Sequence, residues 1–576
     1  MARDLYKDCL SRSFAGHKLE AMTGQKTREQ LYRLNCHAAA QLRPFSRHAD
    51  GLDTFPYGTP AFLRHGRGLT AVSRVLGFIR DILIAAGLGS GPVADAFFVA
   101  FRFPNLFRRL FAEGAFNAAF VPLFSARLEQ EGREAARRFA GDVLSVMLSG
   151  LLLFTALCLA LMPWIMQLIA PGFTENSEKF ALTVELTRIA FPYLLAMVVT
   201  ALLGGVLNSL YRFAAAAAAP IILNLFFIAA LTVALPHFAT APGHVLAWTV
   251  TLAGLAQVVF LALCARRAGM SLRLPRPRLT PGVRRLLALM VPGVLSAGVM
   301  QINLLIGTMI ATLQAGAVSY LYYADRVYQL PLGILGIGIG VVLLPDLSRK
   351  LRAGAGEAAR DSMNRALEYA LLLTLPATFA LALVPESLVT GLFQRGAFDD
   401  EAARATGQAL AAFAIGLPSY VLVKLFQPAF FAREDTRTPF HLTLVSILAN
   451  VALSLLLFWR IGFVGIALAT AISSWLHVVL LVVVLSRRGF LEPDRRLLDR
   501  SLRSLLASAL MGGLLLVLAP QVNAWLAMGP LGQAAALALL VGSGLAVYAL
   551  AALLLGAVTL GEVKRLLRRR NPDAVS

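Results

Sequence analysis

The sequence predicts an all-α polytopic membrane protein with about 14 transmembrane helices. Of its 576 residues, 58% are hydrophobic and 15% are charged, and the mean hydropathy is +0.70. A soluble domain of this length is normally about a quarter charged. The apolar residues gather into runs of about 20, the length that crosses a bilayer as a helix, and basic residues alternate from one connecting loop to the next.

The apolar runs follow one another along most of the chain. They cover residues 66–88, 93–124, 141–169, 180–208, 215–236, 243–265, 284–313, 316–345, 361–390, 402–431, 439–458, 461–486, 499–520 and 531–560. The last two runs carry no charge in their central parts and are rich in Leu, Ala and Gly. That composition is typical of helices that face lipid or apolar protein on nearly every side.

Positive charge lies mainly on one side of the predicted membrane. Loops after the even-numbered spans and the C-terminal tail carry clusters such as Arg133, Arg137 and Arg138, the run from Arg266 to Arg285, and Lys564 to Arg570. The opposite loops carry only Lys179, Arg395, Arg404 and Arg460. This asymmetry predicts that both termini are cytoplasmic. The net charge of +21 therefore reflects topology, and no nucleic-acid partner is expected. Contact of the basic tail with anionic membrane lipids is a second reading.

Residues 1–65 differ from the rest of the chain. They are polar, contain His17, His37 and His48, and include no apolar run long enough for a signal sequence. The segment is interpreted as a disordered or non-native leader, with a histidine-bearing regulatory tail as the alternative. Cys9, Cys36, Cys158 and Cys264 show no paired spacing that would indicate a disulfide or a metal site.

Charged residues inside the first two spans are the main functional signal. The first span contains Arg74, Arg80 and Asp81, and the second contains Asp95, Arg102, Asn105, Arg108, Arg109 and Glu113. On one ideal helix Asp95, Arg102, Arg109 and Glu113 fall within about 40° of one another, although Pro104 is expected to kink the helix. Because charge near a bilayer centre is costly, these side chains must face a watery or protein-lined interior.

No enzyme motif was found. The chain lacks a zinc-protease motif, a nucleophile elbow, a Walker lysine loop and a dinucleotide fingerprint. The glycines of LGILGIGIGVVLLP, near residue 336, indicate close helix packing or a hinge. The number of spans suits a secondary transporter in which two bundles move about a central site. Neither catalysis nor a cofactor is therefore expected.

Three strings carry a resemblance to a known family. SRVLGFIRD (73–81), ADAFFVAFRFPNLFRRLFAEGAFNAAFVP (94–122) and YYADR (322–326) resemble the MurJ (MviN) family of lipid II flippases. The resemblance implies two six-helix lobes around a central cationic cavity, with the N-terminal lobe at 66–265, the C-terminal lobe at 266–490, and two further helices and a tail at 491–576. It also implies transport of undecaprenyl-pyrophosphate-linked disaccharide-pentapeptide across the bacterial inner membrane for peptidoglycan synthesis.

The predicted interior is positively charged overall. Arg74, Arg80, Arg102, Arg108, Arg109, Arg326 and Lys424 outnumber Asp81, Asp95, Glu113 and Asp325. Such an excess suits a dianionic pyrophosphate, which the planar fork of arginine can grip without losing its proton. The resemblance gives pyrophosphate binding to Arg74, Arg80 and Arg108. It gives polar cavity or gating roles to Asp95, Asn105, Glu113, Asp325 and Lys424.

Several of these residues have a structural alternative. Arg109 and Lys424 could extend toward the membrane surface, Asp81 could only neutralise Arg74 or a neighbouring helix, and Asp325 could form an ion pair with Arg326. Gln329 stands where many relatives carry a glutamate, which puts an acid-dependent gate there in doubt. Some relatives are thought to bind sodium through carboxylates on the seventh and eleventh spans. Those runs here hold Gln301, Asn303 and Asn450 and no acid, so no metal site is expected.

Three other functions were weighed. A flippase for another polyprenyl-pyrophosphate-linked glycan would share the same anion. A MATE-like exporter of cationic drugs would need an acidic or aromatic cavity, against the positive balance here. A membrane glycosyltransferase would need an acidic or metal cluster, and Asp399, Asp400 and Glu401 are better explained as the start of a helix. The expected partners are lipid II and membrane lipids, with the cell-wall synthesis machinery as a further candidate.

Overall fold

A computed structural model describes residues 60–109, 115–238 and 240–562. Residues 69–576 form one compact unit, and of the other unit, residues 1–68, only the start of the first helix is described. The N-terminal part of the predicted leader and the basic tail beyond residue 562 therefore lie outside the described residues.

The described chain is helical and contains no strand, which confirms the predicted all-α class. The elements are α3 (Pro60–Leu88), α4 (Pro92–Arg108), α5 (Ala115–Gln130), α6 (Gly132–Ala160), α7 (Met162–Ile169), η3 (Pro171–Phe173), α8 (Ser177–Ala190), α9 (Tyr193–Ser209), α10 (Phe213–Ala229), η4 (Ala230–Ala234), α11 (Leu235–His237), α12 (Pro242–Arg267), α13 (Pro281–Ala311), α14 (Ala317–Arg352), α15 (Gly356–Leu383), α16 (Pro385–Phe393), α17 (Asp400–Ile415), α18 (Leu417–Phe431), α19 (Arg437–Ile461), α20 (Phe463–Arg487), α21 (Arg495–Leu526) and α22 (Pro530–Leu554).

Proline divides several predicted spans into two helices. Pro163 lies in the first turn of α7, Pro385 begins α16, and Pro418 lies in the first turn of α18. Proline lacks a backbone N–H and is tolerated in a first turn, where that group would be unpaired in any case. Each break therefore follows the local sequence, and the predicted spans 141–169, 361–390 and 402–431 are broken helices.

Ten helices or joined helix pairs in the described chain are long and apolar enough to cross a membrane, and α13 adds an eleventh if its two bent halves count as one span. The protein is thus a multi-pass membrane protein. Helix α3 has Arg74, Arg80 and Asp81 within its apolar part, and α4 has only 17 residues. The predicted number of about 14 spans stays a prediction.

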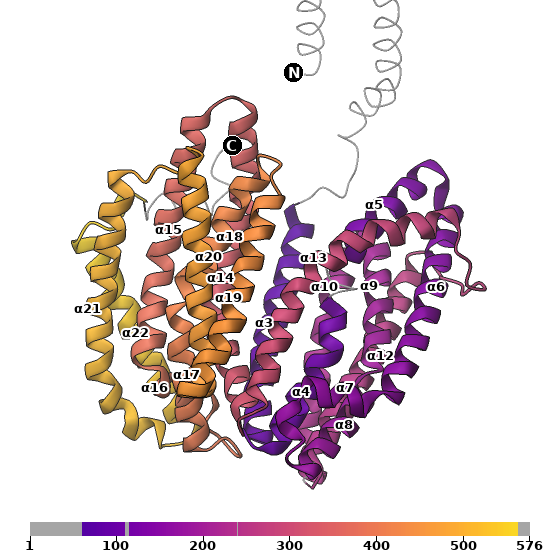
Figure 1. The fold of residues 1–576 in the computed structure, drawn as a ribbon, viewed down its shortest axis with the longest axis horizontal. Helices are drawn as coiled ribbons and strands as arrows, with labels where there is room; N and C mark the ends of the chain where they lie inside the picture. Colours follow the sequence, from indigo (N-terminus) through magenta and orange to yellow (C-terminus); the bar gives the residue numbers. More distant parts are fainter. Residues whose placement is uncertain (1–59, 110–114, 239, 563–576) are drawn as a thin grey trace, which may run out of the picture. The chain divides into compact units, whose positions relative to one another are not determined.

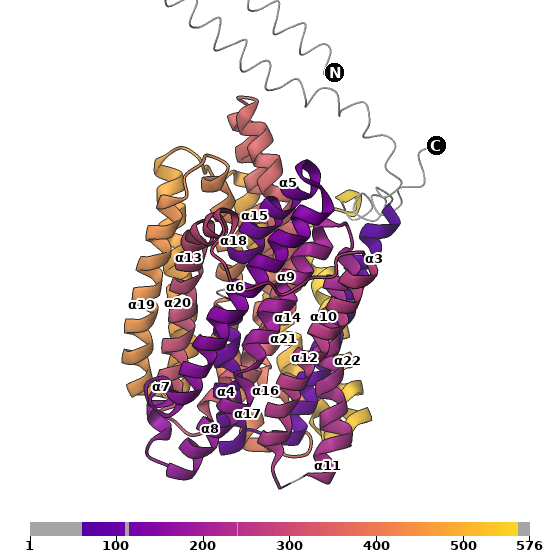
Figure 2. The same cartoon turned by 90° about the vertical axis from the view of Figure 1, so that its right-hand side faces the viewer.

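The helices pack as two groups joined by a few elements. Helices α4, α8, α9, α10 and α12 contact one another, and α14, α15, α17, α18 and α20 form a second set of mutual contacts. Helix α13 packs against α5, which contacts α9 of the first group, and against α19, which contacts α20 of the second. Helices α19 and α20 lie side by side in both views, while α21 and α22 pack on each other and on α15 and α16 (Figures 1 and 2).

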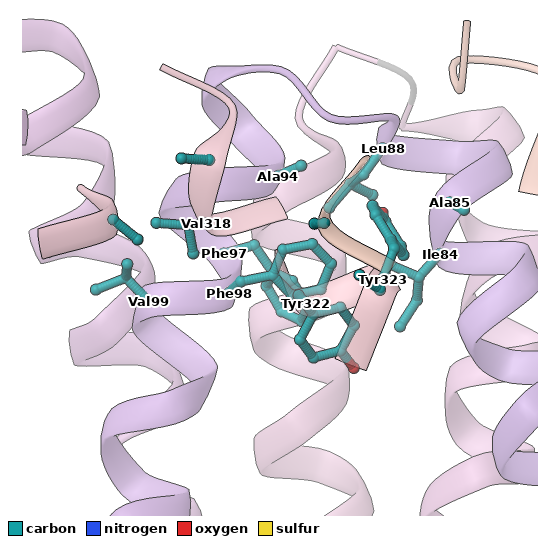
Figure 3. Packing of buried hydrophobic residues seen from close by; sticks show 14 of the residues in the cluster. Ile84, Ala85, Leu88, Ala94, Phe97, Phe98, Val99, Val318, Tyr322 and Tyr323 are labelled. Atoms are coloured by element: carbon teal, nitrogen blue, oxygen red, sulfur yellow. The ribbon is translucent and has the colours of Figure 1, made fainter. Parts of the chain in front are cut away.

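Aromatic side chains fill the contact between α4 and α14. The rings of Phe98 and Tyr322 stack with their centroids 3.9 Å apart, and Tyr323 meets Phe98 edge-on at 5.4 Å. Figure 3 shows these rings beside Ile84 and Leu88 of α3. Stacked and edge-on aromatic pairs add to the free energy gained from burial alone. This contact fixes the two groups of helices against each other at one end of the cavity described below.

A buried ion network attaches the last two helices to α15. Glu368, 5% exposed, accepts from Arg365 of its own helix and from Arg500 of α21. Arg500 also donates to Glu562, just after α22, at 2.9 and 3.0 Å. A carboxylate this deeply buried needs its cations, because an unpaired buried charge is very unfavourable.

We expect Glu368→Gln to lower the free energy of unfolding by about 3 kcal/mol, because it leaves the buried Arg500 short of one of its anions. The measurement is the apparent melting temperature of the purified protein. Arg404→Gln is the control, because Arg404 and Glu386 form an exposed pair at 3.9 Å whose loss costs at most about 0.5 kcal/mol. Equal melting temperatures for the Glu368 and Arg404 variants would contradict the assigned role.

Candidate functional site: a cavity lined by arginine

A cavity of about 600 Å³ lies among α3, α4, α5, α9, α10, α12 and α14. It is lined by Arg80, Arg102, Arg108, Arg109 and Arg326. None of the described lining residues is an aspartate, a glutamate or a lysine. Walls of low dielectric constant strengthen the field of these guanidinium groups. The cavity can therefore attract an anion and gives a cation no partner among its described lining residues.

Side chains of α3 and α10 accept hydrogen bonds from the Arg80 guanidinium and fix its orientation. Its Nε and one terminal nitrogen donate to Asp81 Oδ1 at 3.0 and 2.7 Å, and the other terminal nitrogen donates to Asn224 Oδ1 at 3.0 Å. The amide of Asn224 in turn donates to the carbonyl of Ser73 at 2.9 Å. Because a guanidinium has five N–H groups, these three contacts orient Arg80 and leave donors for a ligand.

The carboxylates of Asp81 and Asp325 contact these arginines and do not line the cavity. Asp81 is 3% exposed and accepts from Tyr322 Oη at 3.3 Å as well as from Arg80. Asp325 pairs with Arg326 at 3.3 Å, and the Arg326 guanidinium lies over the Tyr322 ring, 4.9 Å from its centroid. The Asp325–Arg326 ion pair considered as an alternative is thus present, whereas Asp81 pairs with Arg80 and not with Arg74. Gln329 donates to Asp325 and is exposed.

Helix α4 supplies the other arginines. Arg102 donates to Thr308 Oγ1 on α13 at 2.5 Å, and Arg108 Nε donates to Asn105 Oδ1 at 2.9 Å. The Asn105 amide donates to the backbone carbonyl one turn earlier, which fixes its oxygen toward Arg108. Arg109, at the C-terminal cap of α4, lines the cavity and is exposed.

The prediction of one helix over 93–124 stays a prediction, because residues 110–114, Glu113 among them, lie outside the described residues. Helix α4 ends at Arg108 and α5 starts at Ala115. Both pack on α9; α4 also packs on α8 and α12, and α5 also packs on α6 and α13.

Two predicted cationic residues lie away from the cavity lining. Arg74 is exposed and donates to the carbonyl of Gly333 at 3.1 Å, which links α3 to α14. Lys424 on α18 is also exposed, and no hydrogen bond or ion pair joins it to another described residue. In this structure neither side chain contributes to the arginine-lined surface.

Asp95 joins α4 to α14 about one turn before Phe98, a residue of the cavity lining; this contact is called the Asp95 seal. Asp95 is fully buried, pairs with Lys179 of α8 at 2.7 Å, and accepts from the backbone N–H of Gly316 at 2.9 Å. Its other oxygen accepts from Ser319 N at 3.0 Å and Ser319 Oγ at 2.6 Å. Four donors thus satisfy this carboxylate, which joins α4 to the start of α14.

Close backbone contacts strengthen the same seal. Ala397 N donates to Ala86 O at 2.8 Å, between the end of α3 and the loop after α16. Gly89 and Gly396 have φ angles of +64° and +57°, and a Cβ at either would lie 2.4 Å or less from a backbone oxygen across the contact. Only glycine fits both the conformation and the distance. This end of the cavity is therefore closed by main chain as well as by Asp95.

Sodium ligands are not assembled where some relatives are thought to have them. Asn450 Nδ2 of α19 donates to Asn303 Oδ1 of α13 at 2.9 Å, and Asn450 Oδ1 accepts from Ser473 Oγ at 3.3 Å. Among the described residues no group of three or more histidine, cysteine, aspartate or glutamate side chains could hold a metal ion. The neutral residues present do not fit a carboxylate-based cation site.

Several residues of the site were not predicted as such. Asn224, which orients Arg80, lies in an apolar run, and Gln257 of α12 and Thr200 of α9 line the cavity from similar runs. Lys179 was noted only as a loop charge. A lone polar residue in each apolar span is the signal that could have identified the first three.

The fold and this site define a class: a multi-pass membrane protein with a cationic, ligand-sized cavity among α3, α4, α5, α9, α10 and α12 that α14 of the second group completes, an arrangement that suits a secondary carrier. A family model described as lipid II flippase MurJ matches residues 84–531. The chain belongs to this family, which confirms the resemblance seen in its sequence.

Curated relatives and solved structures agree with that assignment. The chain is 46% identical over 515 residues to the "Probable lipid II flippase MurJ" of Rhizobium tropici, covering 88% of this chain and 96% of the relative. It is 35% identical to the lipid II flippase MurJ of Burkholderia cenocepacia, over 74% of this chain and 84% of the relative. A solved structure of a lipid II flippase MurJ in an inward closed conformation superimposes with a TM-score of 0.69 at 23% identity, over 84% and 97% of the two chains. An inward-facing MATE family transporter superimposes with a TM-score of 0.60 at 16% identity. The match covers 72% of this chain and 94% of the transporter.

Proposed function

We propose that this protein moves lipid II, the undecaprenyl-pyrophosphate-linked disaccharide-pentapeptide, from the cytoplasmic to the periplasmic leaflet of the bacterial inner membrane. The arginine-lined cavity is the observation that carries this proposal, and family membership supports it. A pyrophosphate matches the guanidinium fork in charge and geometry, while the isoprenoid tail can stay in lipid. No bond of the substrate changes, so no catalytic residue is required.

The distribution of basic residues supports the orientation. The cavity reaches Asn208 and Ala216, on either side of the loop that carries Arg212, and the Asp95 seal lies at the other end of α4. Loops on the Arg212 side are the basic ones, which supports a cytoplasmic location for these loops and for both termini. In this proposal the cavity receives its substrate from the cytoplasmic side.

Transport follows by alternating access. Arg80, Arg102, Arg108 and Arg326 hold the pyrophosphate, the cytoplasmic side closes, and the Asp95 seal then separates as the lobes 66–265 and 266–490 rock. Asp325, Arg74 and Lys424 act as gating positions in this cycle. Helices α21 and α22 offer the isoprenoid tail an apolar surface. The substrate must bind the two states with different affinity, since only such a difference can shift their populations.

The test is the leaflet exposure of lipid II in cells depleted of this protein. Loss of outer-leaflet exposure is the expected result, and re-expression of the wild-type chain should restore it. Unchanged exposure would overturn the proposal and point to another polyprenyl-pyrophosphate-linked glycan. Exporters of cationic drugs are disfavoured, because no carboxylate is present among the described residues of the cavity lining.

Binding of the pyrophosphate should not depend on pH near neutrality. Arginine does not lose its proton in proteins, and the described lining contains no histidine or carboxylate. We therefore expect less than a roughly twofold change in the affinity of the purified protein for lipid II between about pH 6 and pH 8, because its pyrophosphate is esterified at both ends and does not titrate in that range. A tenfold change would show that a titrating group takes part in binding.

A further inference from the structure

The cavity has a second wall that carries no charge. Helices α9, α10 and α12 line it with Thr200, Asn208, Asn224 and Gln257, separated by small residues such as Ala201 and Gly204. The small side chains leave space beside the polar ones, and a Cβ on Gly204 would already touch Ala216 at 3.7 Å. This wall faces the same cavity as the arginines but offers hydroxyl and amide groups instead of charge.

Gln257 presents an unsatisfied acceptor. Its side chain is buried, with the residue 3% exposed, and its Nε2 donates to the carbonyl of Ala219 on α10 at 2.7 Å. This bond fixes the amide, and its Oε1 has no hydrogen-bond partner among the described residues. Leaving a buried acceptor unpaired is unfavourable. An oxygen in this position at a cavity wall calls for an N–H or O–H donor from a ligand.

The buried hydroxyl of Thr200 also has no hydrogen-bond partner among the described residues. Buried threonines of the neighbouring helices donate to the backbone carbonyl four residues earlier, as Thr183 and Thr187 of α8 and Thr249 of α12 do at 2.6 to 2.7 Å. The hydroxyl of Thr200 is buried and has no such bond in the described structure. It remains able to donate and accept, which is what a sugar hydroxyl or an amide requires.

A continuous set of contacts connects this wall to Arg80. Arg80 donates to Asn224 of α10. Gln257 donates to the carbonyl of Ala219, which precedes Asn224 by five residues on the same helix. Five residues along a helix correspond to about 7.5 Å. That separation is comparable with the size of one sugar ring. In lipid II the disaccharide is joined directly to the pyrophosphate, so a pyrophosphate held at Arg80 places the first sugar near this wall.

We propose that Thr200 and Gln257 form a neutral subsite that binds the hydroxyl and amide groups of the sugar next to the pyrophosphate. This inference rests on the proposed function and extends it to the headgroup. The arginines then bind the anion shared by all polyprenyl pyrophosphates, and the neutral wall distinguishes carriers with a sugar headgroup from those without one.

The experiment compares two ligands with the full chain purified in lipid nanodiscs. Lipid II has the sugar, whereas undecaprenyl pyrophosphate has the same tail and a pyrophosphate with a free terminal phosphate in place of the sugar. Each ligand is therefore compared between the variants and the wild type, not with the other ligand. The double variant Thr200→Val/Gln257→Leu should bind lipid II about tenfold more weakly, because two hydrogen bonds are lost, and undecaprenyl pyrophosphate unchanged. Thr200→Val alone, which keeps the side-chain shape, should show a smaller loss for lipid II only.

Two controls separate the possible outcomes. Thr155→Val removes another buried, unpartnered hydroxyl that does not line the cavity, and should change neither affinity. Arg80→Ala should weaken the binding of both ligands. If the double variant lost affinity equally for both ligands, or lost no affinity for lipid II, the proposed subsite would be overturned. Unchanged binding of both ligands to Arg80→Ala would instead overturn the proposed function.

Discussion

Arg80→Ala should abolish the transport of lipid II while the protein remains folded in the membrane. The substitution removes a guanidinium that is oriented by Asp81 and Asn224 and lines the cavity. Losing about two charge-assisted hydrogen bonds corresponds to about 3 kcal/mol, or roughly 100-fold weaker binding of the pyrophosphate. The measurement is complementation of a cell depleted of its flippase, together with the amount of protein in the membrane.

Helix α3 keeps other attachments in this variant, which is why folding should survive. The Asn224 bond to Ser73 O and the Ala397 bond to Ala86 O do not involve Arg80. Arg137→Ala is the control, because Arg137 forms a surface pair with Glu134 at 2.8 Å outside the cavity lining. Normal complementation by Arg80→Ala would contradict the assigned role.

Asp95→Asn should open the sealed end of the cavity and stop transport. The change leaves Lys179, 9% exposed at its side chain, without its anion, at a cost of about 3–5 kcal/mol for a buried pair. It also weakens the bonds from Ser319 and Gly316, because a neutral amide oxygen accepts less strongly than a carboxylate. The measurement is labelling of a cysteine at position 318, where the wild-type valine is 3% exposed, by a membrane-impermeant maleimide in a chain whose own cysteines are replaced.

The double variant Asp95→Asn/Lys179→Met is the matched control. Removing both charges avoids the unpaired ammonium group, and replacing a buried ion pair by neutral groups is often tolerated. The cysteine at position 318 should therefore again be largely protected from the maleimide. If Asp95→Asn alone left the cysteine fully protected, the carboxylate could not be what holds this end closed.

The sequence was a good guide to the arginines and a poor guide to their partners. Charge is so unfavourable in a membrane that Arg80, Arg102 and Arg108 had to face an interior, and they do. The same argument placed Asp95 in that interior too. Its contacts with α14 come from residues more than 200 positions away, and no local pattern encodes such a contact.

Helical periodicity was useful within α4. It relates Arg102 to Arg109, and both line the cavity, but it says nothing of the packing of α5 on α6 and α13. Gln257 and Thr200 were missed for another reason. A single neutral polar residue in an apolar run has the same appearance whether it satisfies a backbone group or leaves an atom unpaired, and only coordinates distinguish the two.

A binding surface built from guanidinium groups alone does not discriminate among phosphates. Nucleotides and inorganic phosphate dissolved in the cytosol could occupy the arginines as readily as a lipid does, since the described lining holds no carboxylate to repel them. The isoprenoid chain offsets this competition by confining its own headgroup to the membrane surface, where the effective concentration is far higher than in free solution. Water-soluble diphosphates should accordingly inhibit the carrier in detergent more strongly than in a bilayer.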